Sequence, residues 1–349
     1  MLRDWALPLL RCLECRGRLQ SGPADVVCTI CGRSYPETDD VVDFLYRPHA
    51  AVERERNAVR QLDREGHTLN EYSRDVLRRL DAGALTELDL TGSKYLRTIA
   101  ESRQQIIELL RTEPFAAGST VLEVGADTCW ASSVLLASGC RVIATDITDH
   151  LLLAPSGASH NLCRLQADMN ALPLGDDSVN VVFAASCLHH SWDLSRTFRE
   201  IARVLKPGGT GYFCGEPMPS LARFVVGGGF GRKERELGIN ETWIRRRNWL
   251  RWSRQAGLEP RIVFPELTRQ QLEARLRSKH VPGFVARLLR PMLSALQVSA
   301  HLRVDKVALT DAERHELSAL RKSGRLAESE RLRPPARAIG SSPDIRRSF

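Results

Sequence analysis

Four cysteines near the N-terminus have the spacing of a metal-binding site. Cys12 and Cys15 form one C-x-x-C pair, Cys28 and Cys31 form a second, and 12 residues separate the two pairs. Four thiolates so spaced can close a tetrahedral shell around one Zn²⁺. Two disulfides are the alternative, but the other cysteines are scattered among apolar residues, as in a protein from a reducing compartment. The spacing therefore predicts a zinc site.

The residues around these cysteines carry a family resemblance. After the second pair the chain continues "GRSYPETDDVVDFL", and residues 9–46 resemble the small zinc-ribbon domain of the activator subunit that partners tRNA and release-factor methyltransferases. That domain also occurs fused to bacterial methyltransferases. The resemblance implies a folding and docking module. A shell of four cysteines leaves no open coordination position, so the implied Zn²⁺ is structural.

Acidic residues recur further along at three places where a nucleoside could be bound. Glu123 lies inside an apolar run, Asp146 ends the next run 21 residues after Gly125, and Asp168 ends a third run 22 residues later. An acidic side chain at the end of a second parallel strand can accept hydrogen bonds from both ribose hydroxyls. By itself this spacing also fits NAD.

The loop in "VLEVGADTCWAS" departs from the glycine-rich form of nucleotide-binding loops. Gly125 is present where the backbone passes closest to a ligand, but Asp127 and Cys129 occupy the next two usual glycine positions. Because Asp tolerates the left-handed backbone region, the turn can persist at Asp127. We expect a working variant loop, in which the Asp127 carboxylate either faces the ligand's amino group or caps the helix that begins at Trp130.

Alternating elements must position these residues. Helical patterns fill much of residues 48–117, and from residue 118 short apolar runs alternate with helix-like segments. The runs are "TVLEVG", "CRVIATD", "NLCRLQAD", "VNVVFAAS" and "GTGYFCGE". Such runs are typical of a buried parallel sheet flanked by helices. The sequence predicts a doubly wound α/β fold.

The second half of this region resembles a known family. The stretch "QADMNALPLGDDSVNVVFAASCLHHSWDLSRTFREIARVLKPGGTGYFCGEP" is similar over its full length to class I S-adenosylmethionine-dependent methyltransferases of the methyltransferase-11 type. The resemblance covers residues 118 to about 264 and implies a mostly parallel, seven-stranded, Rossmann-like sheet. It implies that Asp168 and Met169 hold the adenine and that the run from Ser186 to His189 lines the sulfonium pocket. The implied S-adenosylmethionine site comprises Glu123, Gly125, Asp127, Asp146, Ile147, Asp168, Met169 and Ser186.

A histidine pair follows the fourth predicted strand. His189 and His190 lie where a methyl acceptor would approach, and imidazole titrates near neutral pH, so either can serve as a general base. Packing in the pocket wall is the alternative for both. Further along, Glu216, Asn240 and Glu241 either contact a polyhydroxylated acceptor or are ordinary polar loop residues.

The kind of acceptor is narrowed by a missing motif. Methyltransferases of base amines and glutamine amides usually carry Asn/Asp-Pro-Pro-aromatic after the fourth strand, where this chain has "AASCLHH". We therefore expect transfer to a hydroxyl, or a carbon, of a small or glycosidic metabolite. An RNA base methyltransferase and a catalytically inactive scaffold with the same fold are the alternatives.

Four regions follow from these patterns. They are a zinc ribbon at 1–47, a helical linker at 48–117, a methyltransferase domain at 118–309 with a lid insertion at 217–240 and basic helices at 265–298, and a C-terminal helix with a disordered tail at 310–349.

Charge is distributed unevenly along the 349 residues. Residues 1–216 hold 23 Lys and Arg against 29 Asp and Glu, whereas residues 217–349 hold 27 against 13. The basic part favours an anionic partner such as nucleic acid, a phosphorylated substrate or lipid head groups, or is simply a solvated surface. No apolar run approaches the roughly 20 residues that cross a bilayer, and no signal-peptide pattern opens the chain. The expected location is the cytoplasm.

Overall fold

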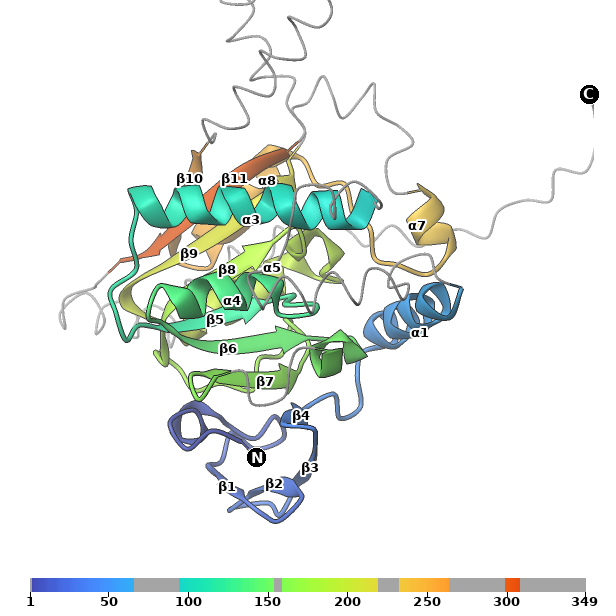
Figure 1. Ribbon diagram of the computed structural model, residues 1–349, viewed down its shortest axis with the longest axis vertical. Helices are drawn as coiled ribbons and strands as arrows, with labels where there is room; N and C mark the ends of the chain where they lie inside the picture. The colour runs from blue at the N-terminus through green and yellow to red at the C-terminus, as the bar shows by residue number, and fades with distance from the viewer. Residues whose placement is uncertain (1, 66–93, 154–158, 219–231, 264–298, 308–349) are drawn as a thin grey trace, which may run out of the picture. The chain divides into compact units, whose positions relative to one another are not determined.

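The structure, a computed structural model, describes residues 2–65, 94–153, 159–218, 232–263 and 299–307 (Figure 1). The described residues all belong to one compact unit, which ends at Val307. The predicted basic helices at 265–298, the tail at 310–349 and most of the predicted lid lie outside the described residues. Of that lid, the short helix α7 (Arg232–Glu236) is described. No helix within the described ranges is long and apolar enough to cross a membrane.

A sheet of mixed direction forms the centre of this unit. Its central strands are β5 (Thr120–Val124), β6 (Arg141–Asp146), β7 (Leu162–Gln166), β8 (Val179–Ala185), β9 (Leu205–Pro217), β10 (Leu258–Val263) and β11 (Ser299–Lys306). They lie in the order β7-β6-β5-β8-β9-β11-β10. The first five pair in parallel, and β11 runs antiparallel to both β9 and β10. The five apolar runs are thus the parallel strands, and the predicted doubly wound α/β fold is confirmed.

Helices cover both faces of this sheet (Figure 1). They are α3 (Lys94–Thr112), α4 (Trp130–Ala137), α5 (Leu194–Val204) and α8 (Arg246–Gln255). Successive residues of β5 point to opposite faces, as the pleat requires. Val121 belongs to the core that contains Ile106 of α3. Leu122 belongs to the other core, where Phe198 of α5 meets Trp249 of α8 edge to face at 6.1 Å between ring centroids.

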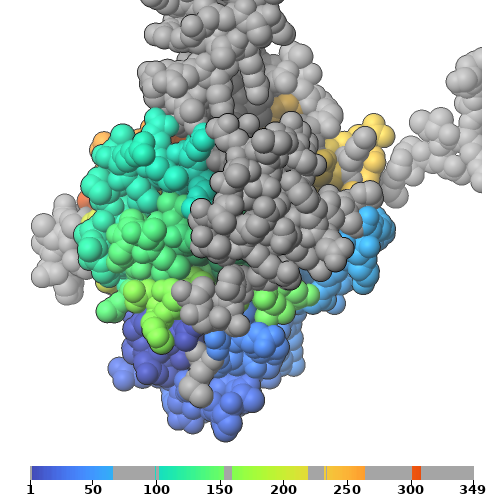
Figure 2. All heavy atoms as spheres, in the orientation of Figure 1, coloured from blue at the N-terminus to red at the C-terminus, as the bar shows by residue number. Residues whose placement is uncertain are grey.

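The N-terminal ribbon extends the same sheet. It contains a 3-10 turn, η1 (Leu7–Leu9), and the strands β1 (Leu19–Ser21), β2 (Asp25–Cys28), β3 (Ser34–Thr38) and β4 (Val41–Asp43). Strand β4 pairs in parallel with β7, with Val42 opposite Leu165. Leu10 and Cys12 are buried in the core that contains Leu122. Figure 2 shows the blue atoms of the ribbon directly against the green atoms of the sheet region. The ribbon and the sheet therefore share one hydrophobic core.

Helix α1 (Ala50–Arg64) lies in the segment predicted as a linker. His49 caps it by accepting a hydrogen bond on Nδ1 from the Ala51 amide at 3.2 Å. Its buried face comprises Ala51, Val52, Glu55 and Ala58, a helical spacing with one carboxylate among small apolar residues. A buried carboxylate requires a specific partner, which the site described below supplies.

The shared core can be tested at β4. Val42 is fully buried, so Val42→Ala should lower the free energy of unfolding by about 1–3 kcal/mol. Val263→Ala in β10 is the matched control, because this valine is 42% exposed and should change stability by less than about 0.5 kcal/mol. Denaturant unfolding followed by circular dichroism measures both. Equal, small changes would mean that β4 does not contribute to the core of the sheet.

Candidate active site

A cavity of about 390 Å³ opens at the carboxyl ends of β5, β6, β7 and β8. Ligands of open parallel sheets bind at this edge, and pockets of this size are typical for small molecules. Of the predicted cofactor residues, the lining includes Gly125, Asp127, Asp146, Ile147, Asp168, Met169 and Ser186. The fold thus brings together residues that lie up to 61 positions apart in the sequence, from Gly125 to Ser186.

Glu123 is the predicted cofactor residue that does not line the cavity. It is 2% exposed inside β5 and accepts a hydrogen bond from the Ser132 hydroxyl of α4. Burial raises the pKa of Glu123 to about 8. In this structure the side chain joins β5 to α4 beneath the loop.

Gly125 is held where no side chain fits. Its φ is +69°, and a Cβ added there would lie 2.4 Å from Cβ of Cys187, the second residue after β8. The glycine therefore permits both the backbone conformation and the close approach of two loops. Asp127 and Cys129 also have positive φ, at 51° and 61°. The expected left-handed backbone conformation at Asp127 is present, and Cys129 adopts the same conformation.

The Asp127 side chain pairs with a histidine. Cys129 is the N-cap residue of α4 and makes no capping side-chain hydrogen bond. The Asp127 carboxylate lines the cavity and lies 2.5 Å from Nδ1 of His150, whose Nε2 lies 2.6 Å from the Asp63 carboxylate of α1. Burial opposes its charge, but the two carboxylates raise the pKa of His150 to about 10. A charged imidazole thus ties the loop to α1.

Asp146 and Asp168 hold local structure at the cavity wall. Asp146 accepts hydrogen bonds from the Asp127 amide and from the amide and hydroxyl of Thr148, each at 2.8 Å. Burial and the Asp127 charge raise its pKa. Asp168 accepts a hydrogen bond from Nε1 of Trp192 at 2.9 Å. That indole stacks on His49 at 4.0 Å between ring centroids, so the start of α1 closes this side of the cavity.

The two predicted catalytic histidines occupy different positions. His190 lines the cavity, and its Nδ1 lies 2.8 Å from the Glu55 carboxylate of α1. His189 lies behind it, 6% exposed, with Nδ1 2.9 Å from Glu216 at the end of β9. Burial disfavours its charged form, yet Glu216 and Glu241 raise the pKa of His189 to about 9. Of the two, His190 is the one that a cavity ligand can reach.

Some cavity residues were not predicted. Helix α1 contributes Val52, Glu55 and Val59, and His150 follows β6. The signal for α1 was its apolar stripe, in which Glu55 occupies a core-facing position. For Asn240 the sequence left two alternatives, contact with the acceptor or an ordinary polar loop residue. Asn240 lines the cavity and donates a hydrogen bond to the Glu55 carboxylate at 2.9 Å.

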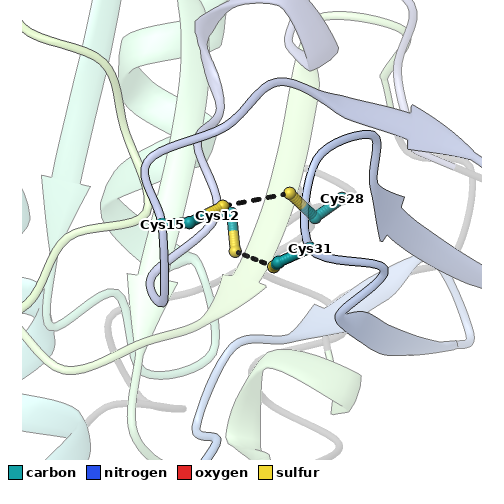
Figure 3. A group of neighbouring side chains, drawn as sticks. All are labelled: Cys12, Cys15, Cys28 and Cys31. Atoms are coloured by element: carbon teal, nitrogen blue, oxygen red, sulfur yellow. Dashed lines mark hydrogen bonds between the residues drawn. The ribbon is translucent and has the colours of Figure 1, made fainter.

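The four N-terminal cysteines form a second site (Figure 3). All four sulfurs lie within 4.8 Å of one another, with 3.6 Å between Sγ of Cys12 and Cys31 and 3.4 Å between Sγ of Cys15 and Cys28. Tetrahedral Zn²⁺ with bonds of about 2.3 Å separates its sulfurs by about 3.8 Å. The spacing fits such an ion.

Hydrogen bonds favour thiolates at two of these positions. Although burial works in the opposite direction, the backbone amides of Cys31 and Ile30 lower the pKa of the Cys28 thiol to about 6. Burial would raise the pKa of Cys12, but the net shift is downward, because the Tyr35 hydroxyl lies 3.2 Å from its Sγ. That hydroxyl accepts from the Leu13 amide at 2.9 Å, which leaves its proton for the sulfur.

Known proteins resemble the sheet region. A family model described as a methyltransferase domain matches residues 122–213, from β5 into β9. The chain contains a methyltransferase domain. This domain holds all of the cavity residues predicted for the cofactor, and the fold around it is the class I methyltransferase fold, as expected.

Curated relatives match this methyltransferase domain. Demethylmenaquinone methyltransferase of Mycobacterium marinum is 31% identical over 165 residues, which cover 47% of this chain and 66% of that protein. The protein of the same name from Clavibacter sepedonicus is 30% identical over 146 residues, covering 39% and 60%. The chain spans less than two thirds of the length of both relatives.

Two solved structures are similar to this chain at low identity. A complex of the Haloferax volcanii Trm112 methyltransferase activator with a methyltransferase is 19% identical, with a TM-score of 0.44, and covers 69% of this chain and 100% of that chain. Geranyl diphosphate methyltransferase with S-adenosylmethionine is 20% identical, with a TM-score of 0.46, and covers 62% and 92%.

The charged His150 makes stability depend on pH. Its pKa is about 10 when folded and about 6.5 when unfolded, so its contribution is complete below pH 6.5 and is lost as pH rises through 10. His150→Gln should lower the free energy of unfolding by an amount on the order of 2–4 kcal/mol at pH 6. The difference from wild type should shrink steadily toward pH 10.

Urea unfolding at several pH values measures this difference. His160→Gln is the matched control, because His160 is exposed and should leave the curve unchanged. A His150→Gln deficit that stays constant from pH 6 to pH 10 would contradict a charged imidazole between Asp127 and Asp63.

Proposed function

We propose that this protein is an S-adenosylmethionine-dependent methyltransferase. The observation that carries the proposal is the cavity at the carboxyl edge of the methyltransferase domain, where the Gly125 backbone passes beside Asp127, Asp146 and Asp168. When bound, S-adenosylmethionine supplies a methyl group activated on a sulfonium. The residues present fit it, because carboxylates face a cavity of suitable size and Gly125 leaves the backbone bare.

Each predicted cofactor residue has a role in the proposal. Asp127 faces the ligand's amino group, and Asp146 at the end of β6 accepts from the ribose hydroxyls. Asp168 and Met169 hold the adenine, and Ser186 lies beside the sulfonium. Since Asp146 is bonded to Asp127 and Thr148 in this structure, ribose hydroxyls would share or replace those bonds. Glu123 supports the loop from below.

We place the methyl acceptor at the end of the cavity that contains His190 and Asn240. Methyl transfer requires in-line alignment and removal of the acceptor's proton, which His190 is positioned to receive. The motif that holds a planar amine nitrogen is absent, which favours a hydroxyl or a carbon. The relatives are named for demethylmenaquinone, which is a small molecule. From that name we infer only that the acceptor of this protein is also a small molecule.

Cofactor binding can be measured by titration calorimetry. The wild-type protein should bind S-adenosylmethionine, whereas Gly125→Ala should weaken binding at least tenfold by pushing the loop away from Cys187. Gly118→Ala is the matched control, because Gly118 has a similar φ of +77° but nothing within 4 Å of an added Cβ. Its stability should fall while its affinity is retained.

One outcome would contradict the proposal, and another would contradict the role given to Gly125. A folded wild-type protein that binds no S-adenosylmethionine would instead be the inactive scaffold. Equal loss of affinity in both glycine variants would mean that backbone strain, and not the close approach at Gly125, governs binding.

We also propose that the four cysteines hold a structural zinc ion. Chelation would remove the cross-link among the loops around β1 and β2 and expose the core that the ribbon shares with the sheet. The ribbon would then be both a folding element and a surface for a docking partner, as its resemblance implies.

Zinc can be counted by its release with a thiol-blocking mercurial, which frees only thiolate-bound ions. The wild-type protein should release one equivalent, and Cys31→Ser should release less than one tenth of that. Ser34→Ala, a nearby exposed position in β3, should release one equivalent. Full release from Cys31→Ser would contradict a four-cysteine site.

A further inference from the structure

Three side chains behind the cavity wall converge on one point. Nε2 of His189 and Nε2 of His190 each lie 3.5 Å from the same Glu241 carboxylate oxygen, and the three ligand atoms lie within 4.8 Å of one another. His189 and Glu241 are buried, and His190 is half-buried. Two imidazoles and one carboxylate form a recurrent ligand set for divalent first-row metal ions.

The opposite nitrogen of each ring is already bonded to a buried carboxylate. Nδ1 of His189 faces the fully buried Glu216 at 2.9 Å, and Nδ1 of His190 faces the buried Glu55 at 2.8 Å. In the neutral ring, a proton on each Nδ1 would leave the lone pair of each Nε2 facing Glu241, so a bound metal ion would take the place of the proton on Nε2. Metal-binding histidines are oriented in this way by a carboxylate behind the ring.

These outer carboxylates are themselves fixed. Glu216 accepts from the backbone amides of Cys187 and Leu188 at 3.0 Å and of His189 at 3.3 Å. Glu55 accepts from Asn240 at 2.9 Å. Each imidazole is therefore held in one orientation by groups from a different element, as a preformed metal site requires.

The charges around the cluster are compatible with a divalent ion. Glu55, Glu216 and Glu241 place three carboxylates around two imidazoles, and all three carboxylates are buried. The Arg235 guanidinium lies close to Glu241 and donates to its backbone oxygen at 3.0 Å. With both imidazoles protonated, their charges and that of Arg235 balance the three carboxylates. A divalent ion on two neutral imidazoles would give the same total charge and would also bridge the three ligands.

The spacing is close to that of a shared ion. Metal–nitrogen and metal–oxygen bonds of about 2.1 Å at a tetrahedral angle separate neighbouring ligand atoms by about 3.4 Å. The two nitrogen–oxygen separations of 3.5 Å in the structure are close to this value. A strong charge-assisted hydrogen bond would instead bring nitrogen and oxygen to about 2.8 Å.

We propose that His189, His190 and Glu241 bind one divalent first-row metal ion, such as Mn²⁺, Fe²⁺ or Zn²⁺, at the cavity wall. Three protein ligands leave at least one coordination position open. Because His190 lines the cavity, a cavity ligand can approach that position. This site is separate from the four-cysteine site, which has four sulfur ligands.

The proposal deepens the proposed function and rests on it for the role of the ion. The open position would take the oxygen of a hydroxylated acceptor and lower the pKa of that hydroxyl. The proton would pass to water, the oxygen would form its bond to the methyl carbon, and the sulfur–methyl bond would break to leave S-adenosylhomocysteine. The acceptor class would then be a metal-coordinating alcohol, phenol or enol. His190 would receive the proton only in the metal-free protein, and with the ion bound it would be a metal ligand.

Mn²⁺ is the probe that tests the site, because it prefers nitrogen and oxygen ligands to thiolates. Protein that holds one equivalent of zinc, all of it released by the mercurial and therefore bound to the cysteines, is titrated with Mn²⁺. Free Mn²⁺ is read from its paramagnetic resonance signal. The wild-type protein should bind one equivalent, and Glu241→Gln should weaken binding at least tenfold. Glu236→Gln in α7, whose side chain is 61% exposed, is the matched control and should bind as the wild type does.

Outcomes of this titration separate the two proposals. Equal Mn²⁺ affinity in wild type and Glu241→Gln, or no binding to a wild-type protein that binds S-adenosylmethionine, would overturn the metal site and leave the proposed function intact. Mn²⁺ binding lost in Glu241→Gln and retained in Glu236→Gln would support the site whether or not S-adenosylmethionine binds. If Glu241→Gln keeps its S-adenosylmethionine affinity and its melting temperature, the variant is folded. His190→Asn should also lose Mn²⁺ binding and is a second, independent test.

Discussion

The approach of Gly125 to Cys187 is the constraint on which the site depends. It sets the distance between the loops that follow β5 and β8, and a methyl group at this position would force them apart. On one side of this contact the chain turns through Asp127 toward α4. On the other side the amides after β8 converge on the buried Glu216. The cavity exists because both loops are held at this short separation.

Buried charges fix the remaining walls. Two carboxylates of helix α1 contact histidines at the edge of the sheet. Asp63 is hydrogen-bonded to His150, and Glu55 is hydrogen-bonded to His190. Each of these contacts places an ionisable group away from water, which is costly unless the partner is correctly placed. Such pairs therefore select one docking position for α1, and the helix becomes part of the cavity wall.

Local features of the sequence predicted much of the fold. The five apolar runs became β5–β9, because a strand buried on both faces needs a continuous apolar run wherever it lies. The left-handed turn at Asp127 followed from the backbone preference of that residue. The two cysteine pairs predicted one cluster of four sulfurs, since each pair is close in sequence and a short ribbon joins them. Contacts between distant segments were beyond such reasoning, and so the ribbon's continuity with the core of the sheet was not predicted.

The sequence by itself determined the order of strands and helices, the glycine of the cofactor loop and the sulfur cluster, because each depends on neighbouring residues. Only the tertiary structure decided which polar residues matter at the cavity. Glu55 and His190 are 135 positions apart and meet because α1 packs over the carboxyl edge. Glu216 and Glu241, which could have been ordinary loop residues, are buried against His189. A buried polar side chain needs a specific partner, and which side chains are buried is known only once the chain has packed.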